Sequence, residues 1–463
     1  MPSRPMFTTP ARSEYRPPSA ARPIGTASSS AARSVEAEVS APATTRTGRP
    51  SRGPLTDLLT GGGRARRVLW LLAGLWLLFS LVRIVSGERE LTSSSTLAAA
   101  LLLAVPIGLA ALGGLWSERA GVVNIGLEGM MILGAWGAGW AGYQWGWVGA
   151  VIGGMAFGAA GGLLHAIATV TFGVDHVVSG VAINILAGGV VRFLSELLFT
   201  EDTGGGPTQS PSLASDQPSF SLPVLSSGPD LLGDLEGRHW FLVSDLAGLL
   251  RGLTNGVGLL TLLAVLLIPV SYLLLWHTAF GLRLRACGEN PAAADSLGVP
   301  VYRLKYLAVI VSGALAGLGG VFLVFVAGIY REGQTGGRGF IGLAALIFGN
   351  WRPGGLAAGA GLFGFADALQ LRSQTAVVAL LLLIAVLLAG VAAYQAMRRK
   401  VVQAVLAGAF AVAALVGFLT IERLPEGVVF FTPHLTTLLV LSLASQRLRP
   451  PKADGLVYRR GEH

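Results

Sequence analysis

Residues 305–327 read KYLAVIVSGALAGLGGVFLVFVA, and after Lys305 this stretch contains no charged side chain. A helix needs roughly 20 mostly apolar residues to cross the hydrocarbon core of a bilayer. In lipid the backbone must satisfy its own hydrogen bonds, which an uninterrupted helix does within a single segment. The stretch therefore predicts one transmembrane helix.

The same pattern recurs along most of the chain. Further apolar spans lie at 68–86, 97–115, 122–143, 147–170, 177–199, 256–276, 340–350, 354–371, 376–397, 401–419 and 428–446. The 340–350 span is too short to cross alone, so it must be tilted, joined to its neighbour or re-entrant. The chain is thus expected to be an all-α integral membrane protein, a polytopic bundle of about 10–12 transmembrane helices.

The composition supports a membrane protein and excludes some soluble classes. Hydrophobic residues make up 52% of the chain and charged residues only 13%, whereas soluble domains carry about 25% charged residues. The net charge of +9 would suggest nucleic acid in a soluble chain. Here the basic residues sit in tails and loops, so we expect membrane lipid and no nucleic acid as the partner. The single cysteine, Cys287, allows no intrachain disulfide.

The charges also predict the domain organisation. Residues 1–66, rich in Pro, Ser, Thr, Ala and Arg, are expected to be a disordered cytoplasmic tail. A transmembrane domain follows at 67–447, and a cytoplasmic C-terminal tail at 448–463. Segment 200–255 holds seven acids and two arginines, whereas segment 277–305 is basic. The positive-inside rule places 277–305 and both termini in the cytoplasm and 200–255 outside.

Segment 200–255 has two readings. Its Gly, Pro and Ser clusters predict loop. It is either a solvated loop or part of a docking face for a solute-binding protein outside.

A short capped helix is predicted inside the basic segment 277–305. Asn290 is a good N-cap, and Pro291 suits the first helical position. Alanines follow, and Gly298 supplies a stop with Pro300 beyond it. The helix is expected at 291–297, on the membrane surface. It is either an ordinary connector or a coupling helix that docks on a soluble partner.

A second group of polar residues interrupts an apolar region at Glu118–Gly129. Glu118 and Arg119 fit an interfacial turn, whereas Asn124 and Glu128 lie four residues apart and would share a face if the segment is helical. Glycines here allow an interrupted helix, which recurs at transporter sites. Glu128 either lines a pathway or braces the fold. The candidate pathway residues are Asn124, Gly126, Glu128, Gly129, Gly339 and Phe340.

Glycine spacing predicts close helix packing. Small residues four apart occur at Gly149/Gly153, Gly154/Gly158, Gly313/Gly317 and Gly355/Gly359, a spacing that lets helix backbones approach in lipid. Another Gly-rich stretch runs from Gly336 to Gly349.

Catalytic motifs are missing from the sequence. No lysine follows a glycine, so the Gly-Lys-Ser/Thr ending of a phosphate loop is absent. The six histidines show no metal-ligand spacing. We therefore expect no catalytic residue, no metal and no cofactor on this chain. The sequence predicts a non-enzymatic subunit.

Three sets of residues resemble one family. These are Gly288-Glu289-Asn290-Pro291 with Ala293, Ala294 and Gly298; Asn124-Ile125-Gly126-Leu127-Glu128-Gly129; and Gly336 to Gly349 followed by Pro353-Gly354-Gly355. The chain resembles the permeases of ABC importers for simple sugars, nucleosides and branched-chain amino acids. The C-terminal stretch, with Arg449-Pro450-Pro451 and Gly455-Leu456-Val457-Tyr458, resembles the purine-nucleoside and simple-sugar branch.

The resemblance implies a function and a set of partners. Residues 288–298 would contact the ATPase. The permease would move a nucleoside or simple sugar across the cytoplasmic membrane by alternating access. Its partners would be a second permease subunit, a cytoplasmic ABC ATPase that binds ATP, and an extracytoplasmic solute-binding lipoprotein. The alternative is an ion-coupled secondary transporter, for which the ionisable candidates are Glu128, Arg192, Glu196 and Asp367.

Overall fold

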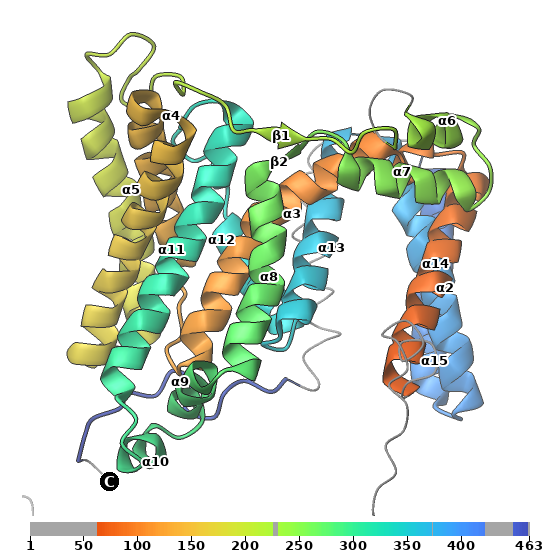
Figure 1. Ribbon diagram of the computed structural model, residues 1–463. Coiled ribbons are helices and arrows are strands. Elements are labelled where there is room, and N and C mark those ends of the chain that lie inside the picture. The colour runs from red at the N-terminus through yellow and green to blue at the C-terminus, as the bar shows by residue number, and fades with distance from the viewer. Residues whose placement is uncertain (1–62, 226–229, 373, 422–447, 462–463) are drawn as a thin grey trace, which may run out of the picture. The chain divides into compact units, whose positions relative to one another are not determined.

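We analysed a computed structural model of the chain, which describes residues 63–225, 230–372, 374–421 and 448–461. Most of the expected N-terminal tail and the expected span at 428–446 lie outside these residues. Within the described part, seven helices are long and apolar enough to cross a membrane. The predicted polytopic, all-α fold is confirmed (Figure 1).

The long helices follow the predicted spans closely. They are α2 (Gly63–Ser86), α3 (Ser94–Arg119), α4 (Leu127–Ala166), α5 (His176–Phe199), α8 (Leu259–His277), α11 (Val301–Ala327), α13 (Pro353–Arg372), α14 (Gln374–Met397) and α15 (Val401–Thr420). The 3₁₀-turn η1 (Arg89–Leu91) precedes α3, and the π-turn η2 (Ile167–Thr171) extends α4. Helix α2 begins at Gly63, before the predicted boundary at residue 67.

Helix α4 is two antiparallel arms. Trp145 and Gly146 leave the helical conformation, and Gly146 has a φ of +69°, which glycine adopts without strain. The two spans expected at 122–143 and 147–170 are therefore confirmed as separate arms. The first arm begins only at Leu127, because residues 122–126 form a non-helical turn.

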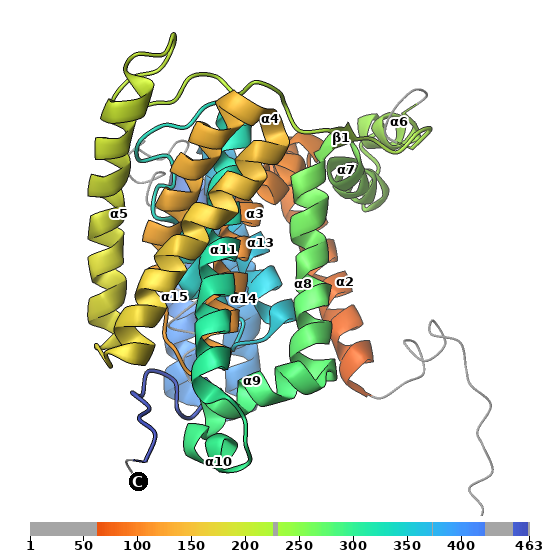
Figure 2. The ribbon, with the colours of Figure 1, turned by 60° about the vertical axis from the view of Figure 1, so that its left-hand side comes forward.

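Glycines set the packing of α4 against α11. A Cβ built on Gly134 would lie 2.2 Å from the Cα of Gly317, and one on Gly158 would lie 2.4 Å from the carbonyl oxygen of Gly313. Only glycine allows this approach, so the helices pack backbone to backbone. Figure 2 shows the two helices crossing closely. The prediction from the Gly154/Gly158 and Gly313/Gly317 spacings is confirmed.

The short span expected at 340–350 is a half-helix. Helix α12 (Arg338–Phe348) has 11 residues and packs against α3 and α13. A tight turn at Asn350 and Trp351, both with positive φ, joins α12 to α13. The span is thus joined to its neighbour, one of the arrangements that its length required.

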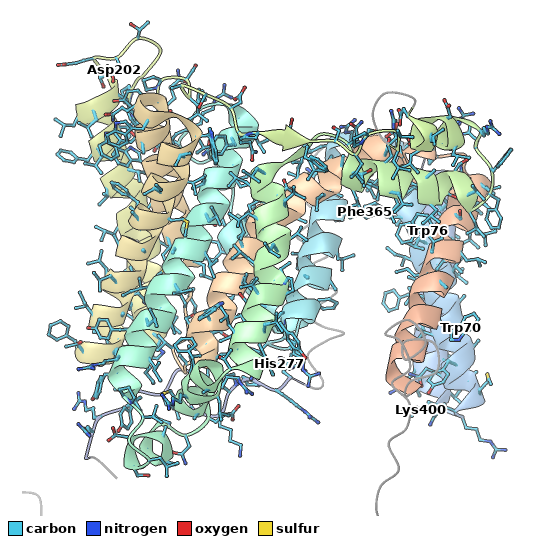
Figure 3. All side chains as sticks on the ribbon, in the orientation of Figure 1. Trp70, Trp76, Asp202, His277, Phe365 and Lys400 are labelled. Carbon is cyan, nitrogen blue, oxygen red and sulfur yellow. The ribbon has the colours of Figure 1, made fainter. Side chains whose placement is uncertain are left out.

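The ends of the bundle differ in charge. We call the end with Asp202 the acidic end, and the end with His277 and Lys400 the basic end (Figure 3). Helices α6 (Leu231–Gly237) and α7 (Val243–Thr254) and strand β1 (Ser219–Phe220), which pairs with β2 (Val257–Gly258), lie at the acidic end (Figure 1). Sequence predicted only loop for 200–255, because Gly and Pro clusters mask these short helices.

Helices α9 (Ala279–Glu289) and α10 (Pro291–Ser296) lie at the basic end (Figure 2). Helix α10 matches the predicted capped helix, whereas α9 was not predicted. The side chain of Thr278 caps α9 by accepting a hydrogen bond from the backbone N–H of Gly281 at 3.1 Å.

Candidate functional site

Two interrupted segments of the chain meet inside the bundle. The first is the turn at 121–126, which precedes α4, and the second is the loop at 328–337, which precedes α12. The 11 residues of α12 span about 16 Å, and its far end adjoins the basic end. The start of α12 therefore lies about halfway through a bilayer core of about 30 Å.

Glu128 joins these two segments. Its carboxylate accepts the backbone N–H of Gly337 at 3.0 Å and that of Gly339 at 2.7 Å. The first N–H groups of a helix have no partner within the helix, and the helix dipole favours an anion there. The side chain of Glu128 is buried, so Glu128 caps α12 from a distance of 211 residues in the sequence.

Asn124 closes the turn that leads to Glu128. Its amide oxygen accepts the N–H of Gly126 at 3.1 Å, and its amide nitrogen donates to the hydroxyl of Ser312 at 2.9 Å. Asn124 is fully buried and lies outside the helix, so it shares no helix face with Glu128. Its contacts fix the turn against α11.

The glycines of this junction are places of close contact. A Cβ on Gly129 would lie 2.7 Å from the carbonyl oxygen of Ile183, and one on Gly339 would lie 2.5 Å from the Cα of Glu128. Gly126 is likewise buried, beside Gly180. Of the six residues expected at a pathway, Phe340 alone has an exposed side chain, at 48%.

Sequence reasoning missed several residues that brace the junction. His165 contacts the hydroxyl of Ser179 at 2.9 Å and the carbonyl oxygen of Val123 at 3.0 Å. His176 accepts the N–H of Val123 at 3.2 Å. Asn184 on α5 accepts the N–H of Gly129 at 2.7 Å. These residues lie far apart in sequence, so no local pattern could have identified them.

Local contacts hold α10 as the sequence predicted. The side-chain oxygen of Asn290 accepts the N–H of Ala293 at 3.0 Å, Pro291 is the first helical residue, and Gly298 has a φ of +80°. Ala293 is exposed, whereas Ala294 is buried against Cys287 and Val301. Burial raises the pKa of the Cys287 thiol to about 11. Helix α10 thus presents one face to solvent.

The loop that carries α10 is fixed to the end of α3. A Cβ on Gly288 would lie 2.4 Å from the carbonyl oxygen of Arg119. Glu289 follows at the end of α9. Arg119 in turn donates to the carbonyl oxygen of Trp351 at 2.6 Å, so α3, α9 and the α12–α13 turn meet at the basic end.

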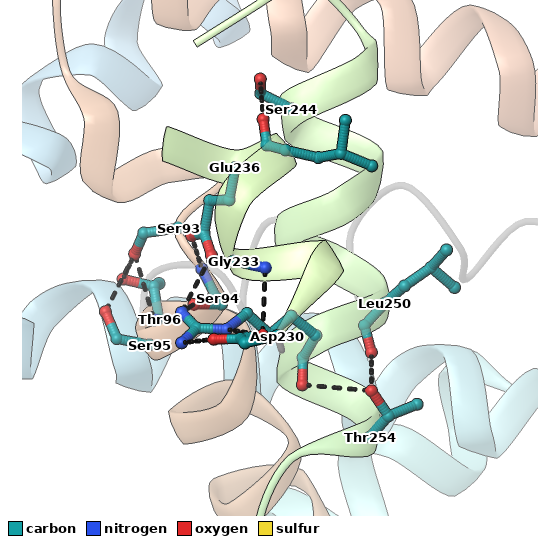
Figure 4. Close-up of polar contacts among 12 residues, drawn as sticks. Ser93, Ser94, Ser95, Thr96, Asp230, Gly233, Glu236, Ser244, Leu250 and Thr254 are labelled. Carbon is teal, nitrogen blue, oxygen red and sulfur yellow. Dashed lines mark hydrogen bonds and ion pairs between the residues drawn. The ribbon is translucent and has the colours of Figure 1, made fainter. Parts of the chain in front are cut away.

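A network of ion pairs organises the acidic end. Arg251 on α7 binds Asp230 at 2.6 Å and Glu236 at 3.3 Å, and Glu236 accepts the N–H of Ser94 at 2.7 Å (Figure 4). The hydrogen bond from Arg251 holds the pKa of Asp230 below its usual value. This network attaches the two short helices to the start of α3, so much of segment 200–255 is ordered structure.

Of the ionisable candidates for ion coupling, two form pairs. Arg192 pairs with Glu332 at 2.6 Å, and Asp367 pairs with Arg338 at 3.3 Å. Glu196 is exposed on α5. Arg192 and Glu196 both lie on α5, whereas the Asp367–Arg338 pair lies beside Gly337 and Gly339, the residues that Glu128 caps.

Comparison with known families gives a match over most of the bundle. A model of the "branched-chain amino acid transport system / permease component" family matches residues 96–390. The match spans α3 to α14 and includes both the Glu128 junction and α10.

Named relatives give more specific likenesses. The guanosine ABC transporter permease protein NupQ of Bacillus subtilis is 38% identical over 59% of this chain and 81% of its own. The nucleoside ABC transporter permease protein NupC of Lactococcus lactis is 30% identical over 77% of this chain and 94% of its own. A putative glucose ABC transporter permease protein of Haloferax volcanii is 36% identical over 64% of this chain and 81% of its own. No solved structure gives a significant match.

Proposed function

The chain belongs to the family of branched-chain amino acid transport permease components, and on that premise we propose that it is the membrane-spanning permease of an ABC importer that carries a nucleoside. The main support is the likeness to the nucleoside permease of Lactococcus lactis, which extends over 94% of that protein. The likeness to a guanosine permease adds to it. The comparisons do not support an ion-coupled transporter.

The proposal assigns partners by chemistry. A permease of this kind does not hydrolyse ATP, so a separate cytoplasmic ATPase would bind and hydrolyse it. The exposed face of α10, with Asn290 and Pro291 at its start, would receive that ATPase. A second permease subunit would complete the pathway, and a solute-binding lipoprotein would deliver the nucleoside outside.

The charge distribution supports an orientation. Arg283 lies on α9, Arg303 in the first turn of α11 and Lys400 between α14 and α15, all at the basic end, which would face the cytoplasm together with the N-terminus. The acidic end, with Asp202 and Asp230, would face the binding protein. The Glu128 junction would then lie near the middle of the membrane, where discontinuous helices form the sites of many transporters.

Uptake into right-side-out membrane vesicles tests this function. The vesicles contain ATP, a protonophore is present, and the binding protein is supplied outside with radiolabelled nucleosides and sugars in turn. We expect nucleoside uptake that requires ATP and ignores the protonophore. Uptake that collapses with the protonophore would overturn the proposal, and ATP-driven uptake of a sugar alone would overturn the assigned cargo.

A variant on α10 tests the coupling role in the same vesicles. Leu297, at the end of α10, is 84% exposed, so Leu297→Arg should leave the fold intact and weaken contact with the ATPase. Leu297→Met is the matched control, because it keeps an apolar side chain of similar size. We expect loss of uptake only in Leu297→Arg.

A further inference from the structure

The end of the chain lies against the loop that carries α10. We call residues 448–461 the C-terminal arm (Figure 2). The N–H of Ala453 donates to the carbonyl oxygen of Gly288 at 2.8 Å, and the N–H of Arg449 donates to Asn350 at 2.7 Å. The arm is thus bonded both to the α9–α10 loop and to the α12–α13 turn.

The arm continues along α10 to the start of α11. Arg460 pairs with Asp295 of α10 at 3.0 Å. The ring of Tyr458 lies 5.7 Å from the ring of Tyr302 on α11. These contacts make α10 and the arm neighbours over the length of this short helix.

A groove separates the arm from the first turn of α10. Its volume is about 360 Å³, and its walls include Glu289, Pro291, Lys452 and Leu456. Leu456 is 60% exposed and Val457 45% exposed. An isolated exposed leucine is common, but two adjacent exposed apolar side chains, Leu456 and Val457, on the wall of one groove indicate an interaction surface.

The charges around the groove indicate what fits it. The arm contributes Lys452 and Arg459 to the groove wall, where Glu289 is the one acidic lining residue among those described, whereas Arg460 is already paired with Asp295. The arm's only acidic residue, Asp454, points inward and interacts with Glu118. A partner that complements this surface carries an apolar side chain surrounded by carboxylates, since interfaces combine an apolar centre with a polar rim of opposite charge.

We propose that the C-terminal arm and α10 form one composite docking surface, and that its occupant is the ATPase subunit, which inserts an acid-flanked apolar side chain into the groove. This proposal rests on the proposed function, which requires an ATPase at the basic end. It adds the arm, which begins 152 residues after the end of α10 in the sequence (448 − 296), to the surface that the loop alone was expected to provide.

The arm also gives docking a route to the Glu128 junction. A Cβ on Gly121 would lie 3.1 Å from the Cα of Gly288 and 3.2 Å from the carbonyl oxygen of Ala453. The turn at 121–126 leads directly into α4, and its first residue, Gly121, is packed between the α9–α10 loop and the arm. A partner that moves the arm would move this turn.

Binding of the purified ATPase to the permease in nanodiscs tests the proposal. The ATPase used is the one that restores ATP-driven uptake to the wild-type permease, so the pair is known to be functional. We expect Leu456→Asp to weaken binding at least tenfold and Leu456→Met to bind like the wild type. Both substitutions are at an exposed side chain, and thermal unfolding of each variant reports whether the fold is kept.

A photo-crosslinker at position 456 identifies the occupant directly. Crosslinking to the ATPase supports the proposal. Crosslinking to a second permease copy, to lipid or to nothing overturns it, as does unchanged affinity in Leu456→Asp. If Leu297→Arg abolishes ATPase binding while Leu456→Asp does not, the arm is excluded and the permease function stands. If no ATPase restores uptake to the wild type, the proposed function itself fails.

Discussion

Glu128 and Gly339 are bound to each other in two ways. The carboxylate of Glu128 accepts the N–H of Gly339 at 2.7 Å, and a Cβ on Gly339 would lie 2.5 Å from the Cα of Glu128. The hydrogen bond needs an acceptor oxygen on one side, and the packing needs a hydrogen atom in place of a side chain on the other. The N–H of Gly339 accounts for the acceptor side chain of Glu128, and the closeness of Glu128 accounts for a glycine at position 339.

Replacing Glu128 should destabilise the start of α12. Glu128→Ala removes the acceptor from the buried N–H of Gly339 and from the N–H of half-buried Gly337, which should cost about 2 kcal/mol. Glu128→Gln keeps one acceptor oxygen but no charge, so we expect a smaller loss of about 1 kcal/mol. Thermal unfolding in detergent measures both, and equal stability of Ala and Gln variants would contradict a capping role.

Alanine scanning of glycines should separate contact positions from open ones. Gly317→Ala places a Cβ 2.5 Å from the carbonyl oxygen of Gly154, so α4 and α11 must move apart, at a cost of about 1–3 kcal/mol. Gly188→Ala is the matched control, since no atom lies within 4 Å of a Cβ there. It should be neutral or slightly stabilising, because alanine favours helix. Similar melting temperatures for the two variants would refute the close packing.

Removing the N-cap of α10 should reduce the coupling of ATP hydrolysis to transport while the protein remains folded. Asn290→Ala loses the hydrogen bond from Ala293 and should cost about 1 kcal/mol locally. Asn290→Asp retains an acceptor and is the control. We expect reduced uptake per ATP hydrolysed in Asn290→Ala and near-normal coupling in Asn290→Asp. Full coupling in the Ala variant would show that the cap is dispensable.

The C-terminal arm should dock more weakly above neutral pH than at acidic pH. Burial of Asp454 raises the pKa of its carboxyl to about 7 when the arm is docked, whereas an undocked aspartate has a pKa near 3.9. The docked state therefore binds the proton more tightly, and docking weakens as the pH rises from about 4 to about 7. The neighbouring groups are Glu118, Arg119 and Lys305, of which the two cations reduce this effect.

A spin label at position 456 measures this pH dependence. Cys287 is buried with a raised thiol pKa and should not react with the reagent. We expect the label to be more mobile at pH 8.5 than at pH 5.5, and Asp454→Asn to remove the difference because asparagine does not ionise. Equal mobility at both pH values in the unsubstituted arm would disprove the linkage.

The apolar spans could be predicted because their cause is local. A run of about 20 apolar residues specifies a spanning helix wherever the chain places it, as for residues 305–327. The cap at Asn290, Pro291 and Gly298 is equally local, since its donors and acceptors lie within one turn. Helices α6 and α7 were missed because contacts such as Arg251 with Asp230 override the loop-forming composition around them.

The sequence by itself determined the fold class, the glycine spacing of the packed helices and the capped helix α10. The tertiary structure alone decided that Glu128 caps α12, that Asn124 bonds Ser312, and that the C-terminal arm lies on Gly288. For Glu128 and for the arm the physical reason is the same. An interrupted helix leaves backbone N–H and C=O groups without partners. The packing of the spans decides which distant side chain or backbone segment forms hydrogen bonds with these groups.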